Sequence, residues 1–149
     1  MNTYTRKVQY YETDRMNFVH HSNYIRWFEE SRIDYLEKAG LPYELLEEKG
    51  FLSPVLGVQC RYRHSCTFGD TVSITTALTA FAPVRFTFSY RIINRESGAL
   101  LVTGSTEHCF LGRDGRVLAL RRADPALAER FAQLCRADAD AFAAANAAD

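Results

Sequence analysis

One long helix followed by a succession of strands is the feature that most constrains the fold of this chain. From Asn23 to Ala39 no Gly or Pro interrupts a run of residues that favour a helix, and Gly40 and Pro42 then end it. Apolar residues recur in this segment at roughly helical spacing, at positions 25, 28, 35, 36 and 39. So broad an apolar face predicts a helix that is wrapped by a sheet.

Most of the chain after this helix has the pattern of β-strands, and apolar and polar side chains alternate most clearly over residues 84–92. The predicted elements are a strand, a long helix, a short helix and strands joined by turns, over residues 4–10, 23–39, 43–49, 71–78, 84–92, 100–111 and 116–120. Strands in hairpin succession imply an antiparallel sheet, and the long helix must cover one of its faces. The sequence therefore predicts an α+β domain.

The chain has the length of one ordinary domain. Its 149 residues contain no Ser/Gly-rich or Pro-rich linker, so we expect a single domain over residues 1–149 with a core at about 4–121. Hydrophobic residues make up 47% and charged residues 24%, which allows a sizeable buried core. Asp124 followed by Pro125 predicts the start of a C-terminal amphipathic helix over about 124–145.

Charge balance and hydropathy disfavour several classes of partner. The 18 basic and 18 acidic residues cancel, so no overall charge favours nucleic acid or an anionic membrane. No apolar run is long enough to span a bilayer, and the first residues lack an apolar signal core, so we expect a cytoplasmic location. The four cysteines form no C-x-x-C pair, and we expect free thiols.

A carboxylate shortly before the long helix is the sharpest candidate for chemistry. Asp14 can be an Asx-turn residue, or it can act as a base or nucleophile, and its position favours neither. The apolar Met16 and Phe18 could dry its surroundings and strengthen the second role. A helix start presents unpaired N–H groups and a partial positive charge that can stabilise an oxyanion, and we expect Ser22 or Asn23 to be the N-cap. This pairing suits acyl transfer.

The adjacent His20 and His21 could suggest a metal site, but we expect no metal. Neighbouring residues of an extended segment point to opposite sides, and the other two histidines lie elsewhere in the chain. A histidine base is a secondary possibility, because no nucleophilic Ser or Cys motif accompanies these residues. His21 matters more for its backbone N–H, which lies where the helix starts.

Further polar residues have both a structural and a functional interpretation. Asn23 and Tyr24 can face a substrate cleft or the sheet, and the core is favoured for Tyr24. Arg85, like Arg61 and Arg63, can lie on a solvated strand face, which we favour, or clamp the phosphates of an anionic cofactor tail. The sequence lacks dinucleotide-binding, P-loop, zinc-protease and serine-hydrolase motifs, so these enzyme classes are disfavoured.

The motif around Asp14 resembles that of the hotdog-fold acyl-CoA thioesterases of the 4-hydroxybenzoyl-CoA thioesterase type. Residues 11–14, 19–24 and 28–32, followed by 68–70, carry the resemblance, which extends over about 4–121. It implies a long central helix wrapped by a curved antiparallel sheet. It also implies a homodimer or homotetramer with active sites at the subunit interface.

The resemblance also implies roles for individual residues. Asp14 matches the carboxylate that attacks the thioester carbonyl or activates water, and the backbone N–H of His21 matches the donor that polarises that carbonyl. Tyr24 would lie beside the acyl group, and Met16 and Phe18 would shape its pocket. The remaining expected substrate contacts are Asn17, Asn23 and Arg85.

At Asn17 many relatives have glycine, and asparagine preserves the turn because it tolerates a positive φ.

No cofactor is expected, because coenzyme A is part of the acyl-CoA substrate. An acyl carrier protein as the donor, a non-catalytic acyl-CoA binding module and, less strongly, a hydratase on the same fold remain alternatives. Acyl length and type are left open.

Overall fold

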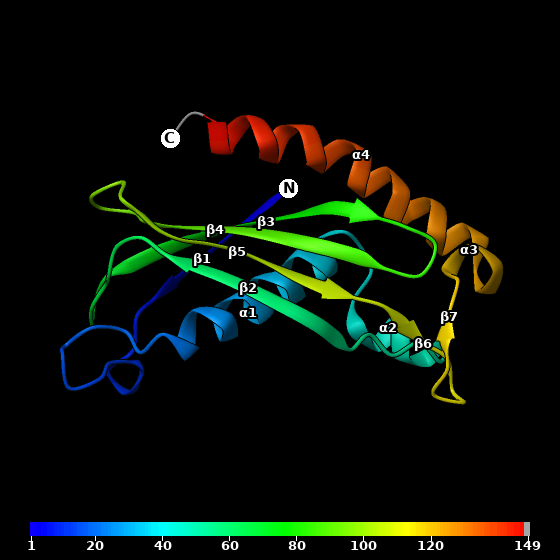
Figure 1. Ribbon diagram of the computed structural model, residues 1–149, viewed down its shortest axis with the longest axis horizontal. Coiled ribbons are helices and arrows are strands. Elements are labelled where there is room, and N and C mark those ends of the chain that lie inside the picture. Colours follow the sequence, from blue (N-terminus) through cyan, green and yellow to red (C-terminus); the bar gives the residue numbers. More distant parts are fainter. Residues whose placement is uncertain (148–149) are drawn as a thin grey trace.

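The computed structural model describes residues 1–147 and contains one five-stranded sheet, a two-stranded sheet and several helices (Figure 1). The strands are β1 (Asn2–Lys7), β2 (Val55–Tyr62), β3 (Thr71–Phe81), β4 (Phe86–Asn94), β5 (Leu100–His108), β6 (Phe110–Leu111) and β7 (Val117–Leu118). The helices are the 3-10 helix η1 (Tyr10–Glu12) and the α-helices α1 (Ser22–Lys38), α2 (Tyr43–Glu48), α3 (Leu120–Ala123) and α4 (Pro125–Ala147). The domain expected over residues 1–149 thus extends two residues beyond the described part.

The main sheet is antiparallel throughout, with the strand order β1-β3-β4-β5-β2. β6 and β7 pair separately. This arrangement confirms the predicted α+β class. β2 forms one edge of this sheet, because it pairs only with β5 and has no strand on its other side.

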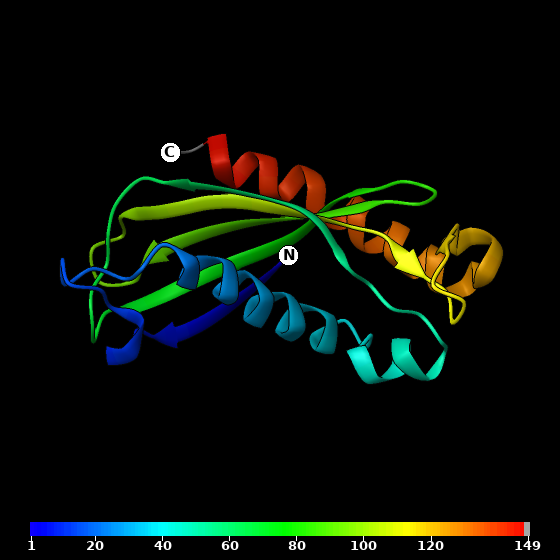
Figure 2. The same ribbon diagram turned by 60° about the horizontal axis from the view of Figure 1, so that its bottom comes forward.

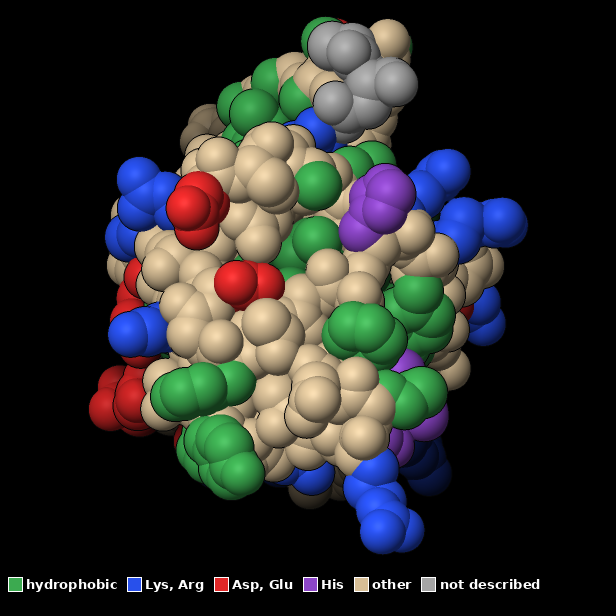
Figure 3. All heavy atoms as spheres, turned by 90° about the vertical axis from the view of Figure 1, so that its left-hand side faces the viewer, with side chains coloured by type: hydrophobic (Ala, Val, Ile, Leu, Met, Phe, Trp, Pro, Cys, Tyr) green, Lys and Arg blue, Asp and Glu red, His purple; other side chains and the backbone are tan. Residues whose placement is uncertain are grey.

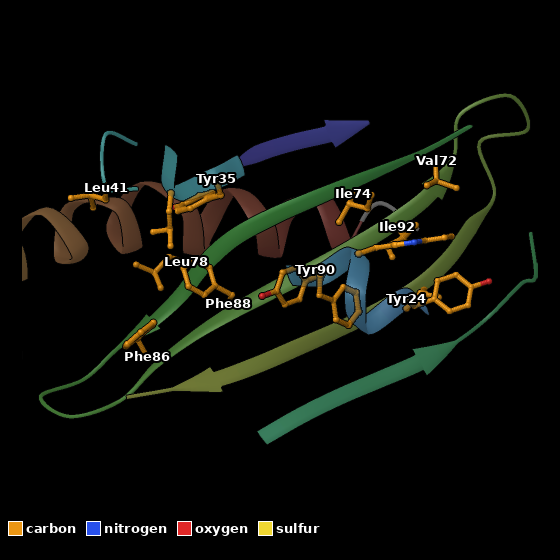
Figure 4. Packing of buried hydrophobic residues seen from close by; sticks show 14 of the residues in the cluster. Tyr24, Tyr35, Leu41, Val72, Ile74, Leu78, Phe86, Phe88, Tyr90 and Ile92 are labelled. Carbon is orange, nitrogen blue, oxygen red and sulfur yellow. The ribbon is translucent and has the colours of Figure 1, made fainter. Parts of the chain in front are cut away.

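α1 lies against one face of the sheet, and α4 runs along β3 (Figures 1 and 2). Every second residue of β4 is buried, at Phe86, Phe88, Tyr90 and Ile92, and Figure 4 shows these side chains along the strand. Their spacing follows from the two-residue repeat of a strand. The ring of Phe28, from α1, stacks on that of Tyr90 with centroids 4.3 Å apart. The long helix therefore lies against the sheet, as its apolar face predicts.

Gly104 of β5 allows this close approach. A Cβ atom at this position would lie 2.5 Å from the Phe28 ring and 2.5 Å from the carbonyl oxygen of Gln59. Both distances are far shorter than a van der Waals contact. A residue without a side chain is therefore what lets α1 pack against the centre of the sheet.

The predicted boundaries need several corrections. α1 begins at Ser22 with His21 as the N-cap, so the expected Ser22 or Asn23 cap is wrong. The reason is that the Asn23 amide donates to the Glu12 carbonyl instead. The long strand expected over 100–111 breaks after His108, because this residue pairs with the ends of both β2 and β4 and no partner strand continues beyond it.

The remaining boundaries are closer to expectation. The first strand ends at Lys7, and the region expected to continue it forms η1 instead. The last short strand spans two residues, and Leu120 already belongs to α3. α4 begins at Pro125 as predicted, and the Asp124 carboxylate accepts a bond of 3.0 Å from the Leu127 N–H. No helix within residues 1–147 is long and apolar enough to cross a membrane.

Candidate active site

The loop that carries Asp14 is a closed turn. Thr13 and Val19 form an antiparallel bridge, and the Asp14 N–H donates to the Phe18 carbonyl over 2.8 Å. Asn17 has a φ of 63°, which confirms the positive φ expected at this position. Its carbonyl accepts a bond of 2.5 Å from the Thr67 hydroxyl. The turn is therefore fixed both internally and against the segment that precedes β3.

Asp14 uses one carboxylate oxygen for the loop. Its Oδ1 accepts a bond of 2.8 Å from the Met16 N–H, which is the Asx turn expected as one of its two roles. Its Oδ2 has no hydrogen bond among the described residues. The two interpretations of Asp14 are therefore compatible, because the turn orients the carboxylate and leaves one oxygen available.

His21 lies at the first turn of α1. Its carbonyl accepts a bond of 3.2 Å from the Tyr62 hydroxyl, and its N–H has no partner among residues 1–147. The rings of His20 and His21 lie with centroids 4.2 Å apart, so the expectation that they point to opposite sides is wrong. The reason is that His21 has helical φ and ψ and does not belong to an extended segment. The unbonded N–H is the donor that an oxyanion would need.

A cavity of about 270 Å³ brings these groups together. The predicted residues that line it are Asp14, Met16, Phe18, His21 and Tyr24. The last residue of β2, Tyr62, and the connection that follows it complete the wall with Arg63, His64 and Ser65. Figure 3 shows this end of the molecule, where hydrophobic and histidine side chains lie beside one another. Asp14, His21 with its unbonded N–H, and apolar side chains thus line one cavity.

Comparison with known proteins identifies the family. Residues 8–139 match the family described as the thioesterase-like superfamily. The chain belongs to this superfamily. A protein of Aquifex aeolicus (strain VF5) with a provisional esterase name is 35% identical over 78% of this chain and 89% of its own length.

Solved structures of thioesterases share the fold. A DHNA-CoA thioesterase from Staphylococcus aureus is 32% identical with a TM-score of 0.82, and the match covers 88% of each chain. A 1,4-dihydroxy-2-naphthoyl-CoA thioesterase from Synechocystis is 22% identical with a TM-score of 0.74, covering 81% of this chain and 90% of the other, and shares the fold. The predicted hotdog fold and the predicted class of thioester hydrolase are thus confirmed.

Three predicted substrate contacts do not line the cavity of this thioesterase: Asn17, which shapes the turn, Asn23 and Arg85. The Asn23 side chain is 9% exposed and donates to the Glu12 carbonyl over 2.9 Å. Arg85 lies at the turn between β3 and β4, at the other end of the sheet, where it pairs with Glu107 at 2.9 Å (Figure 1). Within one chain, neither side chain reaches the carboxylate of Asp14. Their substrate-binding roles stay predictions.

Met16 and Phe18 are more open than expected. They are 68% and 45% exposed, so in a single chain they do not dry the surroundings of Asp14. Exposed apolar side chains at the rim of a cavity can instead contact a ligand or a second chain. Their role in shaping an acyl pocket stays a prediction.

Tyr24 forms the buried floor of the cavity. Its hydroxyl lies 3.4 Å from the Cys66 sulfur, and burial raises the pKa of Tyr24 far above its ordinary value. Burial also raises the pKa of the Cys66 thiol to about 11, so this cysteine is protonated at neutral pH and a poor nucleophile.

All four cysteines are free thiols, as expected. No group of three or more potential metal ligands occurs within residues 1–147.

Sequence reasoning did not find Tyr62, His64 and Ser65. They lie 40 or more positions after the helix start, and only the fold brings them beside it. A usable signal was the polar cluster of residues 61–65 at the end of a strand, since functional residues concentrate where strands run into loops. For Arg63 a solvated position was favoured, and it is exposed but also lines the cavity.

Proposed function

We propose that this thioesterase hydrolyses acyl-CoA thioesters, with Asp14 as the reacting carboxylate. The single observation that carries the proposal is that one cavity is lined by Asp14, whose Oδ2 is free, and by His21, whose N–H is unbonded. The carbon–sulfur bond of the thioester breaks, water supplies the new oxygen, and the products are a carboxylic acid and coenzyme A. The DHNA-CoA thioesterase at 32% identity supports coenzyme A as the carrier.

Two groups divide the chemistry. Asp14 either attacks the thioester carbonyl or removes a proton from the water that does so. The His21 N–H and the partial positive charge of the α1 start stabilise the negative charge on the carbonyl oxygen. A single oxyanion donor of this kind contributes about 10²- to 10³-fold to a rate. Coenzyme A leaves as a thiolate and needs no proton from an acidic side chain, because thiols ionise near pH 8–9.

Met16, Phe18 and Tyr24 would contact the acyl group, since they are the predicted apolar residues of the cavity wall. Asn17 acts mainly through the turn that it permits. Arg85 can contribute a phosphate contact only to a ligand bound at its own end of the sheet, for example at a second subunit. The donor would carry coenzyme A as part of the substrate, and no separate cofactor is required.

The open edge of β2 supports a homo-oligomer. Its Val55, Leu56 and Val58 side chains are exposed, and the strand has hydrogen-bonding groups without a neighbouring strand on one side. Long apolar edges are rarely left uncovered. We therefore propose that two copies pair along β2, which the molar mass in solution would test. A cytoplasmic location stays a prediction from the sequence.

The test is the release of free thiol from short-chain, long-chain and aromatic acyl-CoAs, repeated with the best acyl group on acyl carrier protein. Faster turnover on coenzyme A supports the proposal, and faster turnover on the protein carrier would favour the alternative donor. If no donor is cleaved and intact acyl-CoA stays bound after long incubation, the chain is a binding module and the proposal is wrong.

A further inference from the structure

We propose that Glu12 is a positioning residue that holds the Asp14 loop against the start of α1. The inference rests on the proposed function, because it concerns the geometry of the same site. Glu12 belongs to η1 and precedes Asp14 by two residues. Its side chain is not part of the cavity wall, so it would act through Asp14 and His21 and would not touch the substrate.

The Glu12 carboxylate is buried and fully engaged. It is 4% exposed and accepts two bonds from the Arg6 guanidinium, at 2.8 and 2.9 Å. It also accepts the Gln9 N–H at 2.8 Å and the Trp27 indole N–H at 2.9 Å. Arg6 comes from β1 and Trp27 from α1. One carboxylate thus ties a strand, η1 and the central helix together.

The main chain of Glu12 holds the other end of the loop. Its carbonyl accepts the His20 N–H at 2.8 Å and the Asn23 side-chain amide at 2.9 Å. The loop leaves from Glu12, carries Asp14 and returns to His20, the residue before His21. Because both ends are fixed at a single residue, the position of Glu12 sets the distance between the Asp14 carboxylate and the His21 N–H.

Burying a charged side chain such as that of Glu12 costs free energy of desolvation. Burial raises the pKa of Glu12, but the bonds from Arg6, Gln9 and Trp27 outweigh it, so the pKa lies below its ordinary value and the group is ionised. Well-packed apolar residues often replace a buried ion pair without loss of stability. What they cannot replace is the direction that several hydrogen bonds impose, and a displacement of about 1 Å in an active site can cost about 100-fold in rate.

The test uses Glu12→Gln with two controls. Glutamine has the same length, but an NH₂ group replaces one of the two carboxylate oxygens. Some of the N–H groups that donate to Glu12 would then face another donor. Glu30→Gln is the matched control, since Glu30 also pairs with Arg6 at 2.9 Å but is about 40% exposed. Tyr35→Phe is the stability control, because it removes a buried bond far from the cavity. Thiol release is measured per folded molecule, and Trp27→Phe serves as a second variant if Glu12→Gln does not fold.

We expect kcat of Glu12→Gln to fall at least tenfold with KM within twofold, while both controls keep the natural kcat. Trp27 is the only tryptophan, so its indole N–H signal in NMR reports the Glu12 contact directly, and this signal should shift in Glu12→Gln alone. Trp27→Phe should lower kcat severalfold.

Unchanged kcat in Glu12→Gln, an equal loss in Tyr35→Phe, or an unshifted indole signal would overturn the positioning role while leaving the proposed function intact. Absence of turnover by the natural protein would instead overturn the proposed function and this role with it.

Discussion

The hydroxyl of Tyr35 donates to the carboxylate of Asp138 over 2.5 Å, and this bond joins α1 directly to α4. The same Asp138 oxygen accepts the Leu78 N–H at 3.1 Å. β1 pairs with β3 only as far as Thr76, so Leu78 pairs with Phe88 of β4 on one side and has no neighbouring strand on the β1 side. Asp138 therefore closes the end of the sheet that β1 leaves open.

Tyr35→Phe should destabilise the protein by about 1–3 kcal/mol, because it removes one donor from a buried carboxylate and leaves the ring in place. The measurement is the free energy of unfolding from urea denaturation. An unchanged midpoint would show that the bond between α1 and α4 does not stabilise the fold.

Gly104→Ala should also destabilise the fold, since the added methyl group would collide with the Phe28 ring and with backbone. Overpacking of this kind costs about 1–3 kcal/mol. Gly57→Ala is the control, because a Cβ atom there would meet nothing within 4 Å. Equal melting temperatures of the two variants would contradict the close approach of α1.

His108 should make the protein sensitive to mild acid. Burial, together with the positive charge of Arg32, lowers the pKa of His108 from 6.5 to about 4. As the pH falls, His108 is therefore protonated near pH 6.5 in the unfolded chain but only near pH 4 in the folded chain. Stability is full above pH 6.5 and falls as the pH drops, by about 3 kcal/mol at most.

The measurement for His108 is the urea midpoint at several pH values between 7 and 4.5, in the natural protein and in His108→Asn. Glu12, whose pKa is lowered from 4.5, loses its contribution only below this window. The slope should therefore be shallower in the variant. Parallel profiles would contradict the assignment.

Asn17 should tolerate glycine and reject valine. Its φ of 63° suits Gly and Asn, whereas a β-branched residue is strained there by about 1–2 kcal/mol. We expect Asn17→Gly to keep the natural kcat and Asn17→Val to lower it, because Asp14 lies in the same turn. Equal activity of both variants would show that the turn does not orient the carboxylate.

The sequence was sufficient for features that depend on neighbouring residues. The long helix expected over 23–39, the strand of alternating residues around Tyr90, the Asp124–Pro125 helix start and the positive φ of Asn17 all follow from local patterns, although the helix begins one residue earlier than predicted. Features that depend on residues distant in sequence were not predicted. Tyr62 meets His21 across 41 positions, and the break at Cys109 depends on where partner strands end.

Burial of polar groups was the hardest feature to predict. In the sequence, Glu12 is simply one residue of the motif around Asp14. No local pattern indicates that Arg6 and Trp27 donate hydrogen bonds to its carboxylate. Conversely, the apolar Met16 and Phe18 suggested a dry loop, and both are exposed. Apolar residues at a ligand or subunit surface have the same pattern as core residues.

The most direct test of the central claim compares kcat for thiol release in Asp14→Asn and Asp114→Asn. Asp114 is the matched control, because its Oδ1 accepts the N–H of Arg116 at 3.0 Å, the same two-residue Asx turn that Asp14 makes with Met16. We predict that Asp14→Asn lowers kcat at least 100-fold with the fold intact, and that Asp114→Asn has the natural rate. Natural activity in Asp14→Asn would mean that Asp14 is only a turn residue, which would contradict the account.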